Sequence, residues 1–164
     1  MGYEIAGGWG ARIAQFEREP DKDTVVFTGD GSYLLMNSDI YSSVLTGRKL
    51  IICVLDNGGF AVINKLQNNT GNESFNNLIE DCPTVPAPFA VDFEAHAASM
   101  GAHAETVANP VDFAEAFKNP SAAELISRMV SSAPISTPGT GNEAQMLGSV
   151  VMLRSPPLHR GSSS

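Results

Sequence analysis

One stretch of sequence decides the fold, Thr24-Val25-Val26-Phe27-Thr28-Gly29-Asp30-Gly31-Ser32. Its first five residues form a run rich in β-branched side chains, which is typical of a buried strand in a parallel sheet. A second apolar run, 50–55, leads to Asp56-Asn57-Gly58-Gly59, and a helix-length segment separates the two runs. Together they predict a βαβ unit. Asp30 and Asn57 would then follow the carboxyl ends of neighbouring strands, where open α/β sheets bind ligands.

The residues at these two strand ends suit a divalent cation that carries a diphosphate. Mg²⁺ prefers oxygen ligands in near-octahedral geometry and usually keeps phosphate oxygens among them. Asp30 would supply a carboxylate, Asn57 an amide oxygen and Gly59 a backbone carbonyl. Gly31 lacks a Cβ, so its backbone can approach the phosphates. The amides of Gly31 and Ser32 open a helix, whose N-terminus favours negative charge. In isolation, Gly-Asp-Gly is an ordinary turn; its spacing from Asn57 favours a cofactor site.

Composition narrows the class of protein. A chain of 164 residues with 43% hydrophobic residues and a mean hydropathy of −0.03 is typical of a globular protein. Its net charge of −8 argues against a nucleic-acid surface. We see no signal peptide and no apolar run long enough to span a bilayer. Cys53 and Cys82 lack metal-ligand or redox-motif spacing. We therefore expect a cytoplasmic protein that contacts neither nucleic acid nor membrane.

Further elements follow from periodicity and turn residues. We expect helices at 1–16, 33–46, 60–66, 92–100 and 110–117, and a third strand at 102–107. The long polar segment 67–88 is predicted to lie over an active site, because long loops in compact domains often do so. These elements predict an α/β fold, a three-layer doubly wound parallel sheet.

The chain changes character after about residue 120. Residues 1–120 are expected to form one cofactor-binding domain, and 121–164 an atypical, largely disordered tail rich in Ser, Pro and Gly. The last strand of a doubly wound sheet is expected to be missing there. A helix at 121–130 and a short strand at 150–153 are the remaining candidates for regular structure.

The spacing from Gly29-Asp30-Gly31 to Asn57 resembles the C-terminal cofactor-binding domain of thiamine diphosphate-dependent enzymes. The resemblance covers about residues 1–119. Two segments most resemble the members that hydrolyse a C–C bond of a cyclic diketone in inositol catabolism, Asp56-Asn57-Gly58-Gly59-Phe60-Ala61-Val62-Ile63-Asn64-Lys65-Leu66-Gln67 and Ser74-Phe75-Asn76-Asn77. The stretch 29–43 supports the same match.

The resemblance implies the cofactors thiamine diphosphate and Mg²⁺ and a role for each matching residue. Asp30, Asn57 and the Gly59 carbonyl would hold the metal. Met1 matches the bulky residue that wedges the cofactor into its bent shape. The implied cofactor-binding set is Met1, Gly29, Asp30, Gly31, Ser32, Asn57, Ala61 and Val62.

The chain also departs from this family. Members normally carry a pyrimidine-binding domain whose glutamate activates the cofactor across a dimer interface, and 164 residues leave no room for it. We therefore expect a fragment without its own catalytic residue, beginning at an internal methionine, that needs this partner domain and a dimeric or tetrameric assembly. An acetolactate synthase-like transferase fragment and a non-catalytic remnant are the alternatives.

Five other polar residues have open roles. Glu4 is expected to be a solvated carboxylate that complements the dipole of the first helix. Asn64 and Gln67 could contact substrate or cap local structure equally well. His96 and His103 are distant from any chemical motif and are expected at helix ends or on the surface.

Overall fold

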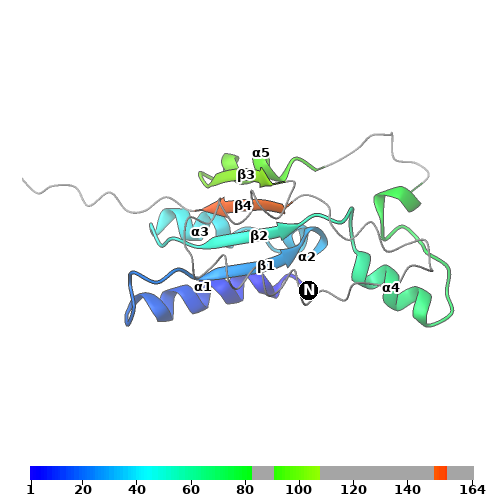
Figure 1. Cartoon of the computed structure of the whole chain (residues 1–164), viewed down its shortest axis with the longest axis horizontal. Coiled ribbons are helices and arrows are strands. Elements are labelled where there is room, and N and C mark those ends of the chain that lie inside the picture. Colours follow the sequence, from blue (N-terminus) through cyan, green and yellow to red (C-terminus); the bar gives the residue numbers. More distant parts are fainter. Residues whose placement is uncertain (83–90, 108–149, 155–164) are drawn as a thin grey trace, which may run out of the picture.

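The computed structural model describes residues 1–82 and 91–107, together with the backbone of 150–154 (Figure 1). Its centre is a four-stranded sheet in the order β1-β2-β4-β3. The strands are β1 (Val25–Gly29), β2 (Ile51–Leu55), β3 (His103–Val107) and β4 (Val150–Arg154). The chain is therefore an α/β protein, as the sequence predicts.

The pair β1–β2 confirms the predicted βαβ unit. The two strands are parallel, with Val25 opposite Ile51 and Gly29 opposite Leu55, so both end at the same edge of the sheet. Four consecutive residues of β2 are buried, which fits a strand covered on both faces. The complete three-layer arrangement remains a prediction.

The candidate strand at 150–153 is present as β4, and its direction differs from the expected parallel sheet. β4 runs antiparallel to both β2 and β3, so the sheet is mixed and β3 points the same way as β1 and β2. The predicted helices at 110–117 and 121–130, and most of the predicted tail, lie outside the described residues.

The helix predicted at 33–46 is wrong as a single element. It forms two helices, α2 (Asp30–Leu35) and α3 (Asp39–Leu45), because Met36 leaves the helical region with φ −149° and ψ 89°. The side-chain amide of Asn37 donates to the carbonyl oxygen of Tyr33 at 3.2 Å. Asn side chains compete in this way for backbone groups, which ends a helix.

The other helices agree with the sequence to within a few residues. They are α1 (Tyr3–Phe16), α4 (Ala61–Asn69) and α5 (Phe93–Ser99), and a 3₁₀ turn, η1, follows at Ile79–Asp81. Asp92 caps α5 as predicted, accepting from the amide of Ala95 at 2.8 Å. α5 packs on β3 and β4.

Helix α1 lies closely against β1 through a glycine. A Cβ added at Gly8 would stand 2.1 Å from Cγ2 of Val26, whereas one added at Gly10 would meet no atom within 4 Å among the residues that the structure describes. Helix α1 therefore packs closely on β1 at Gly8. The core joins α1, α2, α3, α5 and the sheet through one cluster of buried residues, Ile5, Val26, Tyr33, Ile40, Leu50, Ile52, Val54, Phe93, Ala97 and Ala102.

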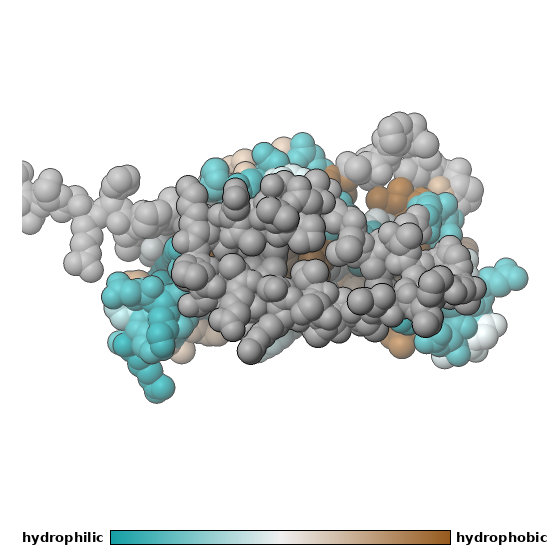
Figure 2. Space-filling model, in the orientation of Figure 1, coloured by the Kyte–Doolittle hydropathy of each residue, from teal (hydrophilic) through white to brown (hydrophobic). Residues whose placement is uncertain are grey.

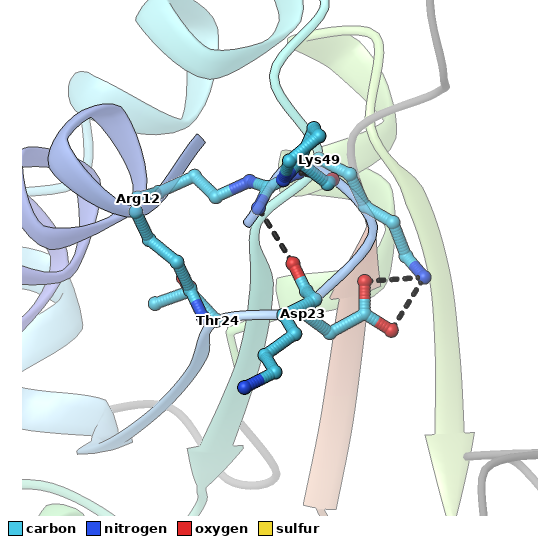
Figure 3. A network of polar contacts seen from close by, with 7 residues as sticks. Arg12, Asp23, Thr24 and Lys49 are labelled. Atoms are coloured by element: carbon cyan, nitrogen blue, oxygen red, sulfur yellow. Dashed lines mark hydrogen bonds and ion pairs between the residues drawn. The ribbon is translucent and has the colours of Figure 1, made fainter. Parts of the chain in front are cut away.

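The amino ends of β1 and β2 are fastened by a polar network (Figure 3). Arg12 of α1 is 3% exposed and donates to the carbonyl oxygens of Lys22, at 2.6 Å, and Pro20, at 3.2 Å. Lys49, just before β2, pairs with Asp23, just before β1, at 2.8 Å. These contacts hold the turn 17–24, whose exposed, mostly charged residues give the hydrophilic surface at the lower left in Figure 2.

In the part of the chain that the structure describes, none of the helices combines the length and apolar character needed to cross a bilayer.

Candidate functional site

Asp30 is the first residue of α2 and follows directly on the carboxyl end of β1. Its side chain is only 3% exposed. Oδ2 accepts a hydrogen bond from the backbone amide of Gly59 at 2.6 Å. This bond crosses from β1 to the turn after β2, so the parallel register of the two strands brings the two predicted clusters together. It also fixes the carboxylate and leaves Oδ1 for another partner.

That partner is the side-chain amide of Asn57. One of its two terminal atoms lies 3.0 Å from Asp30 Oδ1 and 3.1 Å from the carbonyl oxygen of Gly59. With nitrogen at this position, Asn57 donates to both oxygens. With the amide turned over, the Asn57 oxygen takes this position, next to the carboxylate oxygen of Asp30 and the carbonyl oxygen of Gly59. The structure thus brings together the three residues that the sequence predicts as metal ligands.

The geometry of this trio can be compared with that of a magnesium site. Mg–O distances are about 2.0–2.1 Å, so neighbouring oxygens of an octahedron lie about 2.9 Å apart. The separations of 3.0 and 3.1 Å around the Asn57 amide are close to this value. Within the described residues, no group of three His, Cys, Asp or Glu side chains is placed to hold a metal ion. A cation here would therefore rely on one carboxylate, one amide and one backbone carbonyl.

Electrostatics at Asp30 also fit a cation. Burial raises the pKa of the Asp30 carboxyl above its ordinary value, although hydrogen bonds from the amides of Gly31 and Gly59 oppose this shift. The nearby carboxyl of Asp56 raises the pKa further, through its charge and a hydrogen bond. The ionised form of Asp30 is thus disfavoured in the protein alone, and a positive charge beside it would restore it.

The backbone of the turn after β2 favours glycine. Gly58 and Gly59 have φ angles of 81° and 136°, both in the positive region that L side chains rarely adopt. The Gly58 amide donates to Asp56 Oδ1 at 3.1 Å, which closes the turn. On the other side of the site, a Cβ at Gly31 would lie 2.6 Å from the ring of Phe60 and 3.1 Å from the Gly59 carbonyl oxygen. The two loops therefore approach each other through glycine.

The residues predicted to contact diphosphate lie at two helix ends. Gly29, Gly31 and Ser32 surround the start of α2, while Ala61 and Val62 form the first turn of α4. Val62 is 68% exposed, so its part of the helix is accessible to a ligand. Met1 stands at the start of α1 with its side chain 58% exposed. Its role as a wedge, and the phosphate contacts of the other residues, stay predictions.

Glu4 lies closer to the site than the sequence suggests. Its Oε1 accepts from the hydroxyl of Ser32 at 3.3 Å, and its Oε2 is buried with no hydrogen-bond partner among the described residues. Glu4 lies in the first turn of α1 as expected, but the expectation of a solvated carboxylate is wrong, because Oε2 is buried and Ser32 of α2 binds Oε1. The hydrogen bond between Ser32 and Glu4 therefore connects the start of α2 to α1.

His96 and His103, the two histidines in the described residues, form no hydrogen bond with this group of residues. Nδ1 of His96 on α5 lies 2.8 Å from the hydroxyl of the buried Tyr33. His103 begins β3 and is exposed. Their expected positions at a helix end and on the surface are confirmed.

Sequence reasoning missed three contributors to the site. Asp56 acts on the charge of Asp30, Phe60 packs on Gly31, and Asn77 contacts the glycine turn from a distant loop. Asp56 and Phe60 adjoin the recognised motif and could have been found from it. Asn77 lies in the segment 74–77 that carries the resemblance, and in the segment 67–88 predicted to lie over an active site. Its specific contact with the glycine turn was not predicted, because that contact depends on how the segment after α4 folds back.

Comparisons with known proteins agree with this geometry. Residues 1–124 match the family profile described as "Thiamine pyrophosphate enzyme, C-terminal TPP binding domain". The chain is 35% identical over 124 residues to a protein of Bacillus cereus named 3D-(3,5/4)-trihydroxycyclohexane-1,2-dione hydrolase 2, covering 73% of this chain and 19% of that one. It is 45% identical over 75 residues to the protein of that name, without the number, from Geobacillus thermodenitrificans, covering 46% and 11%.

The chain thus spans less than a fifth of the length of these relatives. No solved structure matches it. The profile covers the two strand ends, the glycine turns and the Asp30–Asn57–Gly59 trio, together with most of the described fold. The chain therefore belongs to the thiamine pyrophosphate enzymes and carries their C-terminal cofactor-binding domain.

Proposed function

We propose that this chain is the thiamine diphosphate- and Mg²⁺-binding domain of a hydrolase that cleaves a C–C bond of a trihydroxycyclohexanedione in myo-inositol catabolism. The observation that carries the proposal is the convergence of Asp30 Oδ1, the Asn57 amide and the Gly59 carbonyl at spacings of 3.0 and 3.1 Å. The names of the relatives supply the substrate class.

Each residue of the trio would have a distinct task. Asp30 would bring the negative charge, oriented by the Gly59 amide at its other oxygen. Asn57 would turn its amide over, exchanging a donated hydrogen bond for a metal–oxygen contact. Gly59 would present its carbonyl, and the helix starts at Gly31 and Ala61 would face the phosphate groups. Thiamine diphosphate, when bound, supplies the carbanion chemistry that cleavage beside a carbonyl requires.

Two alternatives remain, and the relatives weigh against one of them. An acetolactate synthase-like transferase would share the metal trio, but the named relatives are diketone hydrolases. A non-catalytic remnant would keep the fold and could hold the cofactor without turnover. The raised pKa of Asp30 favours retention of a cation, because that arrangement is unfavourable for a protein that binds none.

Turnover is proposed to need a second region of protein. The activating glutamate would come from a pyrimidine-binding domain, in a homodimer or homotetramer, and this chain alone would be inactive. Cys53 and Cys82 form no disulfide in the part of the chain that the structure describes, and we propose a reducing, cytoplasmic location.

Isothermal calorimetry with thiamine diphosphate and Mg²⁺ tests the cofactor proposal on the chain as it stands. We expect a saturable heat that disappears in Asp30→Ala. The matched control is Asp39→Ala, because Asp39 is also in the first turn of a helix but binds only Ser42, at 3.2 Å. Equal binding by the Asp30 variant and the wild type would refute the metal assignment.

A second assay tests the substrate. The chain is mixed with the pyrimidine-binding part of the Bacillus cereus relative and offered the dione or pyruvate. Ring opening of the dione supports the hydrolase, and condensation of pyruvate supports the transferase. Cofactor binding with neither reaction supports the remnant.

A further inference from the structure

A loop distant in sequence lies directly against the glycine turn of the cation site. We call residues 70–79, which follow α4, the strap. An isolated antiparallel bridge joins Gly59 to Leu78. A Cβ placed on Gly59 would stand 2.5 Å from the carbonyl oxygen of Asn77 and 3.3 Å from Cα of Leu78. The strap therefore touches the α-carbon of the residue whose carbonyl belongs to the trio.

Two hydrogen bonds connect the strap to the peptide units on either side of Gly59. The Phe60 amide donates to Asn77 O at 2.7 Å, and the Ile79 amide donates to Gly58 O at 2.9 Å. A trans peptide unit is planar, so its C=O and N–H point in opposite directions. A hydrogen bond that fixes the C=O or the N–H of a peptide unit therefore also fixes the direction of the other group.

The other ends of these two units point into the site. The peptide unit between Gly59 and Phe60 has the Phe60 N–H at one side and the Gly59 carbonyl at the other. This carbonyl oxygen lies 3.1 Å from the Asn57 side-chain amide. The peptide unit between Gly58 and Gly59 has the Gly58 carbonyl at one side and the Gly59 N–H at the other. This N–H donates to Asp30 Oδ2 at 2.6 Å. Both peptide units thus reach from the strap to the Asp30 site, one through each side of Gly59.

The strap is itself bound at both its middle and its end by the Gln67 side chain of α4. Oε1 of Gln67 accepts from the side-chain amide of Asn77 at 2.6 Å, and Nε2 of Gln67 donates to the carbonyl of Glu73. The backbone amide of Asn72 also donates to the backbone carbonyl of Gln67, at 3.2 Å. Asn76, directly before Asn77, has a positive φ of 52°, a backbone conformation that few non-glycine residues adopt.

We propose that Gln67 and Asn77 are positioning residues that aim the Gly59 carbonyl at the cation through the Phe60 peptide unit. This inference rests on the proposed function. It favours a structural role for Gln67, because both terminal atoms of its side-chain amide bind the strap. The consequence is selectivity: Mg²⁺ demands near-ideal octahedral geometry, whereas Ca²⁺ accepts irregular ligands.

The test measures Mg²⁺ and Ca²⁺ affinity by calorimetry in the presence of thiamine diphosphate. We expect Gln67→Ala and Asn77→Ala each to weaken Mg²⁺ binding about tenfold, as loss of an orienting partner does. Ca²⁺ binding should weaken about threefold or less because its geometry is less strict. The double variant should bind Mg²⁺ no worse than the weaker single variant, since one hydrogen bond links the two residues.

Asn68→Ala is the matched control. Asn68 adjoins Gln67 on α4 and also binds the strap, through Ser74 at 3.2 Å, but it does not reach Asn77. Its Mg²⁺ affinity should stay within about twofold of wild type, because the path to Gly59 is intact. The Mg²⁺ to Ca²⁺ ratio is independent of the fraction of folded protein, so it separates positioning from a general loss of stability.

The outcomes distinguish the two levels of inference. Wild-type Mg²⁺ affinity in both Gln67→Ala and Asn77→Ala, with binding lost in Asp30→Ala, would overturn the positioning role and leave the cofactor site standing. Equal losses of Mg²⁺ and Ca²⁺ affinity would also overturn it, because the strap would then only support the fold. A wild-type protein that binds neither ion with the cofactor would refute the proposed function itself.

Discussion

The adjacent glycines of the cation turn offer a matched pair of substitutions. Gly58 has a φ of 81°, and a Cβ there would meet no atom of the described residues within 4 Å. Gly58→Ala therefore incurs only the cost of a left-handed alanine, about 1–2 kcal/mol. Gly59 has a φ of 136°, and its Cβ would lie 2.5 Å from the backbone oxygen of Asn77. Gly59→Ala adds about 1–3 kcal/mol of overpacking to a backbone strain of about 1–3 kcal/mol.

The expected sum for Gly59→Ala is about 2–6 kcal/mol of lost unfolding free energy, against about 1–2 for Gly58→Ala. The reduced entropy of the unfolded alanine chain offsets about 0.4–1 kcal/mol in each variant and cancels in the comparison. For a chain of this length, 1 kcal/mol corresponds to a shift of about 2–4 °C in Tm. The atom that meets the new methyl group is backbone, so it cannot rotate away as a side chain would.

Urea denaturation gives the two free energies, and calorimetry with thiamine diphosphate and Mg²⁺ gives cation binding. We expect Gly58→Ala to retain binding and Gly59→Ala to lose it, because the second methyl group pushes the strap away from the ligand turn. Equal stability and equal Mg²⁺ affinity in the two variants would show that the strap does not press on Gly59. The reasoning about the turn would then be refuted.

Four further predictions follow from other contacts. Gly8→Ala should destabilise the protein by about 1–3 kcal/mol in urea denaturation, because the new methyl group clashes with β1. Gly10→Ala should stabilise it by up to about 1 kcal/mol, because the new methyl group would meet no atom of the described residues within 4 Å. A Gly10→Ala variant less stable than Gly8→Ala would contradict the packing of α1. Burial raises the pKa of Asp30, so the cation-free protein should lose stability as the pH increases through that raised pKa. Mg²⁺ affinity should rise over the same pH range, because the carboxylate becomes ionised. A pH series of urea denaturation and of calorimetry should show both trends, and Asp30→Asn should abolish them. Burial raises the pKa of Tyr33 to about 12, so ultraviolet titration should show one late tyrosine that is missing in Tyr33→Phe. Arg12→Met should lower the unfolding free energy by about 2–4 kcal/mol, since it removes two hydrogen bonds from a buried guanidinium; an unchanged urea midpoint would argue against that network.

The predictable part of the molecule is the part set by local patterns. The runs at 24–28 and 50–55 identified β1 and β2, and parallel pairing then required Asp30 and Asn57 to lie at one edge. The metal trio was therefore within reach of sequence reasoning, because Asp30 directly follows β1 and the other two ligands lie in the short turn after β2. Asp92 identified the start of α5 for the same reason, since a cap acts on its own helix.

The rest depended on contacts between distant residues. The break between α2 and α3 arises from one side-chain bond of Asn37, in a segment whose apolar spacing predicts a continuous helix. The strap needed both Gln67 and Asn77 in a specific tertiary arrangement, and neither periodicity nor composition predicts it. The antiparallel direction of β4 could not be read either, because a short apolar run carries no information on its partner strands.

The position of β4 has a practical consequence for any shortened version of the protein. The family profile ends at residue 124, yet Val150–Arg154 pairs with β2 on one side and β3 on the other, over five residues each. Trimming the chain to the profile would expose two rows of unpaired amide and carbonyl groups in the middle of the sheet. Such edges recruit other chains, so the trimmed protein should precipitate or self-associate where the intact chain does not.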